Sequence, residues 1–195
     1  MRIFKTFFGS FIVAVGIVVF LHAQMGADPL SVFLQGIMVQ TGAFLGSSTF
    51  GSLSTGFGLL VLSIVFFVDR SKIGIGSIVN SIFTGLFITL LYGVGFDRLL
   101  PEVGWLWIFL GPVIIGLGLA IYLSADLGAG STEAIMLIFV ERSRFSLKWV
   151  RIVQDGIFVA LGLLLGATTG FGLVSGVLLI GPSIEYSMKL VARWK

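Results

Sequence analysis

One short pattern, Leu-x-Ala-x-x-Gly-Ala, occurs twice in the chain, each time at the end of a long apolar run. The first copy covers residues 21–27 and the second covers residues 123–129. Helix-capping residue types follow each copy, Asp28-Pro29 after the first and Gly130-Ser131 after the second. A much shorter apolar run comes next in both places. The pattern therefore predicts two helix breaks, each leading into a short helix.

The long apolar runs indicate membrane spans. Hydrophobic residues make up 57% of the 195 residues and charged residues only 11%, whereas a soluble domain carries about 25% charged residues. A spanning helix needs about 20 apolar residues. Six runs approach or reach this length, the second being short but extendable backward: residues 7–23, 55–68, 73–92, 105–124, 147–166 and 171–190. We therefore predict an all-α integral membrane protein.

Small residues outside the two breaks also recur at fixed spacing. Gly9, Gly16, Gly111 and Gly118 form two pairs 102 positions apart, as do the two breaks themselves. A later block recurs 96 positions on, with Gly74, Gly76 and Gly85 matching Gly170, Gly172 and Gly181. Three spans per repeat is an odd number, so the two halves would face opposite ways. We predict two inverted three-helix repeats, residues 1–95 and 104–195, in one integrated membrane domain.

The short segments 29–44 and 131–140 leave an alternative count open. If both cross the membrane, the chain has eight helices and a parallel repeat. However, residues 131–140 would form only about 15 Å of helix, against a hydrocarbon core of roughly 30 Å. We therefore favour six transmembrane helices, with a broken or re-entrant helix after the first span of each repeat. The Gly/Ser/Thr-rich stretch 42–56 is predicted as a loop or a loose helix end.

The distribution of Lys and Arg predicts the orientation in the membrane. With six spans and a cytoplasmic N-terminus, eleven of the twelve Lys and Arg residues lie inside or at the inner membrane edge. Only Arg98 falls outside. Because cytoplasmic loops carry an excess of Lys and Arg, both termini are expected in the cytoplasm, and the two breaks would start from opposite sides.

The two breaks suggest a substrate site between the repeats. Non-helical backbone at membrane depth is tolerated only against protein or a wet cavity, and the N-terminus of a half-helix presents free N–H groups. The alternative is that Asp28 and Ser131 only cap short helices. The residues expected to line the site are Asp28, Pro29, Gly130, Ser131, Thr132 and Glu133.

Arg151 and Asp155 are the most informative charged pair. Because residues 156–166 are too few to span alone, the helix must extend back to about Leu147 and include both charges. They lie at positions i and i+4, on one helix face. Ionisable groups at this depth are costly and usually face a bundle interior. The pair is either part of an anion- or proton-coupled site or a self-neutralising structural pair.

Composition and motifs exclude most catalytic chemistry. The chain has no cysteine and a single histidine, His22, which excludes thiolate metal sites, disulfides and most histidine-based catalysis. No common catalytic motif is present. We therefore predict no enzyme activity, no catalytic residue, no metal site and no cofactor. The expected partners are the lipid bilayer and an unidentified small-molecule ligand, with no nucleic acid and with a homo-oligomer as a candidate.

Several of these residues also occur in the same order as the sequence motifs of a known protein family. The order is Arg151-Ile-Val-Gln-Asp155, then Gly162, Gly166, Gly170-Phe-Gly172 and Gly181-Pro182. It resembles the YczE/YyaS/YitT family of bacterial integral membrane proteins, whose pattern is Arg-x-x-x-Asp, a turn with Gly-x-Gly-Thr, then Gly-Pro. The stretch 25–30, Met-Gly-Ala-Asp-Pro-Leu, is similar to that family's Leu-Gly-x-x-Pro break. The resemblance covers nearly the whole chain and implies an inner-membrane protein of transporter type, without a defined general substrate.

The chain departs from that family pattern at two points. Leu173 stands where the pattern has Thr, although Ser77 keeps a hydroxyl at the first-half equivalent. Residues 131–133, Ser-Thr-Glu, stand where Pro-x-Asp is usual, so the second break need not bind the ligand of its relatives.

We predict a small-molecule transporter, or a membrane-embedded substrate-binding subunit, with Arg151 and Asp155 included in the site. The alternative is a non-transporting membrane scaffold or regulator whose glycine-rich faces mediate helix packing and oligomerisation.

Overall fold

The computed structural model describes residues 2–42, 48–168 and 170–192. Over these residues the chain forms eight α-helices, joined in two places by short 3₁₀ turns, and it contains no strand. The predicted all-α class is therefore confirmed. The helices are α1 (Arg2–His22), α2 (Pro29–Thr41), α3 (Ser48–Asp69), α4 (Ile75–Gly93), α5 (Gly104–Leu123), α6 (Ser131–Arg142), α7 (Leu147–Leu164) and α8 (Phe171–Ala192); the turns are η1 (Arg70–Lys72) and η2 (Phe96–Leu99).

Five of these helices are long and apolar enough to cross a membrane: α1, α3, α4, α5 and α8. They correspond to five of the six predicted spans. The remaining one, α7, forms where expected and has 18 residues. It also carries Lys148, Arg151 and Asp155, and its role as a sixth span stays a prediction. Arg193 and Lys195, which contribute to the predicted charge bias, lie outside the described residues.

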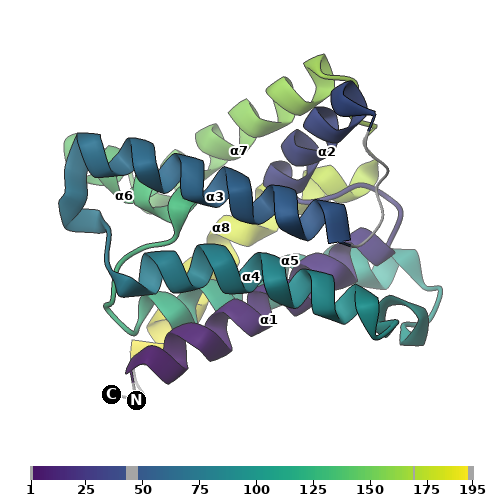
Figure 1. The fold of residues 1–195 in the computed structure, drawn as a ribbon, viewed down its shortest axis with the longest axis horizontal. Helices are drawn as coiled ribbons and strands as arrows, with labels where there is room; N and C mark the ends of the chain where they lie inside the picture. Colours follow the sequence, from purple (N-terminus) through teal and green to yellow (C-terminus); the bar gives the residue numbers. More distant parts are fainter. Residues whose placement is uncertain (1, 43–47, 169, 193–195) are drawn as a thin grey trace.

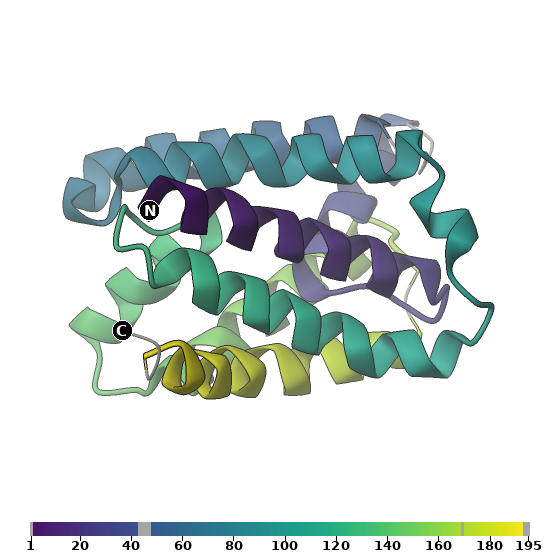
Figure 2. The same ribbon diagram turned by 90° about the horizontal axis from the view of Figure 1, so that it is seen from below.

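The helices form two layers. In the first layer α4, α1, α5 and α8 lie side by side, with α1 and α5 antiparallel at its centre (Figure 2). The second layer contains α3 and α6, which contact each other, and α2 and α7, which do the same (Figure 1). α3 joins the first layer through α4, and α7 joins it through α8. α1 begins and α8 ends at the same end of the molecule (Figure 1).

The short helices α2 and α6 begin near the middle of the molecule and run toward opposite ends (Figure 1). They contain 13 and 12 residues, which is about 20 and 18 Å of helix. Neither length covers a hydrocarbon core of roughly 30 Å, so each short helix is half the length of a span or a little more. The predicted segment 29–44 ends earlier than expected, at Thr41, and residues 43 and 44 lie outside the described residues.

The two copies of the repeated break have matching backbone structure. Gln24 and Asp126, which are 102 positions apart, have positive φ angles of 51° and 55°. Gly26 and Gly128, also 102 apart, have φ angles of 121° and 104°, which favour glycine. The repeated sequence therefore builds the same left-handed turn twice.

Each break is held by the other half of the chain. The Gly172 N–H at the start of α8 donates to the Met25 carbonyl at 2.7 Å, and the Gly76 N–H at the start of α4 donates to the Leu127 carbonyl at 2.8 Å. These two hydrogen bonds join equivalent positions of the two halves. They satisfy carbonyls that a helix break would otherwise leave without a partner.

The recurring glycines allow α1 and α5 to pack closely. A Cβ on Gly118 would lie 2.6 Å from the Val13 nitrogen, and one on Gly9 would lie 2.6 Å from the Tyr122 nitrogen. The equivalent glycines of the other half, Gly111 and Gly16, lie equally close to the opposite helix, because a Cβ on either would also lie under 3 Å from an atom of that helix. Small residues at such crossings let two backbones approach closely inside a membrane.

The prediction of a loop or loose helix end over residues 42–56 is wrong from Ser48 onward, because α3 begins there. Residues 43–47 lie outside the described residues. The small residues of this stretch serve a helix contact: a Cβ on Gly51 would meet the Thr89 hydroxyl, and one on Gly85 would meet that of Thr55. A sequence rich in Gly, Ser and Thr is typical both of loops and of closely packed membrane helices.

We expect Gly118→Ala to lower the melting temperature of the protein in detergent. The added methyl group must push α1 and α5 apart, and overpacking of this kind typically costs about 1–3 kcal/mol. The matched control is Gly156→Ala on α7, where a Cβ meets no atom within 4 Å. This control should be neutral or slightly stabilising, because alanine favours helix more than glycine does. Equal melting temperatures for both variants would contradict the close crossing.

Candidate functional site

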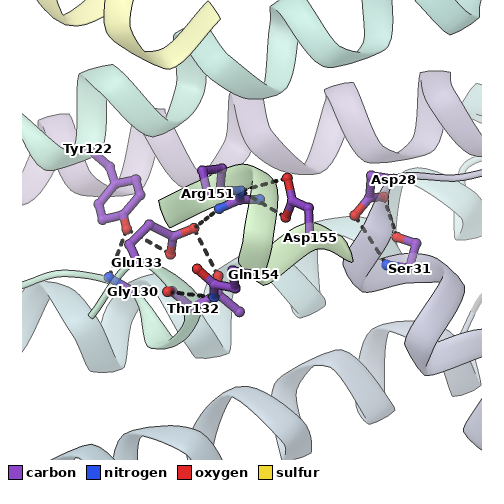
Figure 3. Close-up of polar contacts among 9 residues, drawn as sticks. All are labelled: Asp28, Ser31, Tyr122, Gly130, Thr132, Glu133, Arg151, Gln154 and Asp155. Carbon is purple, nitrogen blue, oxygen red and sulfur yellow. Dashed lines mark hydrogen bonds and ion pairs between the residues drawn. The ribbon is translucent and has the colours of Figure 1, made fainter. Parts of the chain in front are cut away.

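A buried ion-pair cluster lies between the two layers, centred on Arg151 of α7. The Arg151 Nε lies 3.0 Å from Asp155 Oδ1 and donates to Oδ2 at 3.1 Å. Its Nη1 donates to Glu133 Oε1 at 3.3 Å (Figure 3). The exposed fractions are 6% for Arg151, 5% for Glu133 and 0% for Asp155. The predicted pair is therefore a triad, in which one guanidinium joins α7 to the first turn of α6.

Glu133 is also held by neutral donors. The Thr132 hydroxyl donates to its Oε1 at 2.9 Å, and the Tyr122 hydroxyl donates to its Oε2 at 3.1 Å. The same tyrosine oxygen accepts the Gly130 N–H at 2.7 Å. Both carboxylate oxygens of Glu133 thus have partners, and the free N–H at the start of α6 is satisfied by a side chain of α5.

Asp28 approaches the cluster from the other break. It is the N-cap of α2, where its carboxylate accepts the Ser31 N–H at 3.2 Å and the Ser31 hydroxyl. Figure 3 places Asp28 and Ser31 beyond Asp155, on the side away from Glu133. Asp28 is 6% exposed, and Arg151 acts on it through space. Asp28 therefore caps α2, and its carboxylate also belongs to the charged cluster; its place in a substrate site stays a prediction.

The other predicted site residues are less central. Pro29 opens α2 and is buried, and a Cβ on Gly176 of α8 would lie 3.3 Å from its Cδ. Ser131 opens α6, is half-buried and has a neighbour in Gly58 on α3. Gly130 and Thr132 contact the cluster only through Tyr122 and Glu133. The structure therefore brings together Asp28, Gly130, Thr132, Glu133, Arg151 and Asp155, and leaves Pro29 and Ser131 at the edge.

Sequence reasoning missed Tyr122 and Ser31. Tyr122 stands where the first repeat has Phe20, since the two positions are 102 apart. A hydroxyl gained in one copy of a repeat is a signal that could have identified it. Ser31 follows Asp28 by three residues, the spacing at which a capping carboxylate meets a backbone N–H.

Polar contacts also extend from the cluster region to α1 and α4. Asn80 accepts hydrogen bonds from the hydroxyls of Ser10 at 3.2 Å and Thr84 at 2.8 Å. The Ser10 contact joins α1 to α4. Gln154 donates to the Thr132 carbonyl at 3.0 Å, while its Oε1 is buried without a hydrogen-bond partner among the described residues. That oxygen is an acceptor beside the triad that the described part of the chain leaves unused.

Two cavities flank the cluster, one at each break. The first has a volume of about 480 Å³ and is lined by Leu21, Gln24, Gly26, Ala27, Ser31, Gln35, Phe50, Tyr92, Thr168 and Gly170. The second has a volume of about 520 Å³ and is lined by Ser71, Lys72, Ile73, Gly74, Ile75, Leu123, Asp126, Leu127, Gly128, Ala129 and Leu137. Ser31 connects the first cavity to Asp28, because its hydroxyl and N–H contact that carboxylate.

The two cavities are built from equivalent positions of the two halves. Their matching lining pairs are Leu21/Leu123, Gln24/Asp126, Gly26/Gly128, Ala27/Ala129, Gln35/Leu137, Thr168/Lys72 and Gly170/Gly74. The two cavities differ in their charged residues. The second is lined by Lys72 and Asp126, whereas the first is lined by uncharged residues only. Of the residues that line the two cavities, Ser31 in the first is hydrogen-bonded to a carboxylate of the cluster.

Comparison with known proteins finds relatives along almost the entire chain. The model of a family of unknown function (DUF6198) matches residues 1–189. An uncharacterized protein of Haemophilus influenzae is 28% identical over 193 residues, covering 95% of this chain and 83% of that protein. The uncharacterized membrane protein YczE of Bacillus subtilis is 28% identical over 190 residues, covering 93% and 83%. The uncharacterized protein YyaS of Bacillus subtilis is 24% identical over 204 residues, covering 95% and 91%. No solved structure matches the chain.

These relatives confirm the predicted resemblance, because two of them carry the names YczE and YyaS. YczE is a membrane protein by its name, and the five long apolar helices agree with a membrane location for this chain.

We expect Arg151→Gln to destabilise the protein strongly. It leaves Glu133 and Asp155 buried without a positive partner, and removing one member of a buried ion pair typically costs about 3–5 kcal/mol. The triple variant Glu133→Gln/Arg151→Gln/Asp155→Asn should recover much of this loss, because it leaves no buried charge in the triad. Melting temperatures in one detergent provide the comparison. A single variant as stable as the wild type would show that the triad does not hold α6 against α7.

Proposed function

The chain belongs to the DUF6198 family of unknown function, and we propose from its own site that it is a small-molecule transporter. Its substrate site would lie between two inverted repeats, at the cluster of Glu133, Arg151, Asp155 and Asp28. The observation that carries this proposal is a buried charged cluster in a fold with a cavity at each of two equivalent breaks, the first of which reaches Asp28 through Ser31. A membrane-embedded substrate-binding subunit would use the same site.

The inverted repeat is supported by the reciprocal contacts of the two halves. The hydrogen bonds from Gly172 to Met25 and from Gly76 to Leu127 exchange under the same offsets that relate the two sequences. The contacts between helices also correspond in the two halves. The contact of α1 with α4 corresponds to that of α5 with α8, and the contact of α2 with α7 corresponds to that of α6 with α3. An approximate two-fold axis between the antiparallel helices α1 and α5 would relate these contacts, as in many secondary transporters.

This symmetry would place the two cavities on opposite sides of the membrane. With both termini in the cytoplasm, the cavity beside Asp28 opens to the outside and the cavity beside Lys72 opens to the inside. The excess of Lys and Arg in the segments assigned to the cytoplasm supports this orientation in a bacterial inner membrane. The charged cluster then lies between the two openings, where alternating access requires the substrate site.

The glycine-rich faces favour transport over the scaffold alternative, because they are occupied within the chain. A Cβ on Gly162 would lie 2.6 Å from the Val32 carbonyl oxygen of α2. One on Gly176 would lie 3.2 Å from the Phe20 ring of α1. These glycines therefore pack helices of one molecule, and the oligomerisation role assigned to them loses its main support.

The absence of cysteine from the sequence makes the topology directly testable. Gln35→Cys and Leu137→Cys place single thiols at equivalent positions of the two cavities. In intact cells, a membrane-impermeant maleimide should label Gln35→Cys from outside. Leu137→Cys should react only when the cytoplasmic side is accessible, as in inverted vesicles. Ala14→Cys, fully buried on α1, is the unreactive control. Labelling of both cavity thiols from one side would contradict the inverted arrangement.

The role of the cluster is tested by a thermal-shift screen of a small-molecule library on the purified protein. Compounds that stabilise the wild type should not stabilise Asp155→Asn, because a substrate at the cluster contacts the triad or depends on its charge. Glu185→Gln on α8 is the matched control, since Glu185 forms an exposed pair with Lys189 and should leave the response unchanged. Full stabilisation of Asp155→Asn by the same compounds, or a library without any stabilising compound, would favour the scaffold alternative.

A further inference from the structure

The buried cluster contains more negative than positive charge. It has three carboxyl groups, Asp28, Glu133 and Asp155, and one guanidinium, Arg151, and these groups interact with one another through space. In the described part of the chain, Arg151 is the only cationic side chain that pairs with any of the three. If all three carboxyl groups ionise, the cluster carries a net charge of −2. Uncompensated buried charge is costly, so protons or a cationic ligand must offset it.

The lack of compensating positive charge is greatest at Asp28. Glu133 and Asp155 both contact the guanidinium directly, whereas Asp28 has only the neutral Ser31 N–H and hydroxyl as hydrogen-bond partners among the described residues. The charged groups that act on Asp28 through space are Arg151 and Asp155 of α7. Glu133 of α6 acts on these two groups in turn. Asp28 is therefore the carboxyl group best placed to hold a proton, and its partner Ser31 lies on the wall of the first cavity.

The cavity next to Asp28 has walls suited to an organic cation. Of its lining residues, Gln24, Gln35, Ser31 and Thr168 offer oxygen acceptors, and Phe50 and Tyr92 offer aromatic rings. Aromatic faces attract ammonium and guanidinium groups. No Lys or Arg is among its lining residues, in contrast to the second cavity with Lys72. Its volume of about 480 Å³ lies in the range of small-molecule sites.

We propose that the first cavity binds a small organic cation, a substituted ammonium or guanidinium, in exchange for a proton on Asp28. The ion replaces that proton: the neutral carboxyl group loses H⁺ as the cation binds, and the resulting carboxylate pairs with the cation. The charge of the cluster is thus the same before and after binding. The inference rests on the proposed transporter function and names its substrate class and its coupling ion.

The test uses the full-length protein in lipid nanodiscs with three probes. Choline and propylammonium are the cations, and dimethylbutanol is the uncharged carbon isostere of choline. Both cations, but not the isostere, should raise the melting temperature, and binding should release one proton, measured with a pH indicator in weak buffer. The apparent Kd should increase about tenfold for each unit of pH decrease below the pH at which Asp28 ionises, because one proton competes with one cation.

Asp28→Asn removes the charge while keeping a good helix cap, so α2 should still form. This variant should lose both the cation-induced stabilisation and the proton release. Glu185→Gln, far from the cavity on exposed α8 surface, should retain both. If Asp28→Asn does not fold, the proton release and the pH dependence of the wild type decide the matter.

Three results would overturn the proposal: equal stabilisation by dimethylbutanol, cation binding without proton release, or no response to either cation. The proposed transporter function is tested separately, by the side of the membrane from which each cavity thiol is labelled. Labelling from opposite sides, together with no effect of either cation, would indicate a transporter of neutral or anionic substrates.

Discussion

The structure depends on a guanidinium that has to be neutralised away from water. Arg151 is almost fully buried on α7, and an unpaired charge at such a site would be strongly unfavourable. Asp155 supplies a partner on the same helix, and Glu133 supplies one from α6. The second partner ties the position of a short helix to that of a long one. Because α6 begins at this point, the ion pairs also determine where the chain re-enters the bundle after the second break.

A second constraint is the backbone of the two breaks. Each break interrupts the helical hydrogen bonds, and carbonyl groups left free inside a membrane cost several kcal/mol each. The chain satisfies them reciprocally: Met25 accepts from Gly172 in the second half, and Leu127 accepts from Gly76 in the first. A Cβ on Gly170 or Gly74 would collide with these same carbonyls. Neither half therefore provides a complete set of partners for its own break, which explains why the repeated glycines occur in both halves.

Much of the helix arrangement could be predicted from the sequence, because the strongest sequence signals are local. Apolar runs, the two breaks and the helical spacing of Arg151 and Asp155 follow from short stretches, and they predicted the six long and two short helical segments except for the start of α3. The start of α3 at Ser48 could not be read from residues 42–56, because Gly and Ser have opposite meanings in a loop and in a helix crossing. Glu133 was expected at the site, but its contact with Arg151 joins positions 18 apart on different helices. The role of Tyr122 depends on packing that brings α5 to Glu133, whereas Ser31 lies within local capping distance of Asp28.

The two halves also differ in a way that produces one charged cluster rather than two. In the second half, Gly130 leaves room for the Tyr122 hydroxyl, since a Cβ there would lie 2.8 Å from that oxygen. The hydroxyl then satisfies the start of α6 and bonds to Glu133. In the first half, Phe20 has no hydroxyl, and α2 is capped by its own Asp28. Ser31 occupies the position equivalent to Glu133, so each half contributes its carboxylate from a different position. Glu133 pairs with Arg151 directly, and Asp28 interacts with Arg151 through space. The first half has Thr55 at the position equivalent to Arg151, 96 residues earlier. The two breaks are thus similar in backbone structure, but they differ in side chains and contribute their carboxylates to one shared cluster.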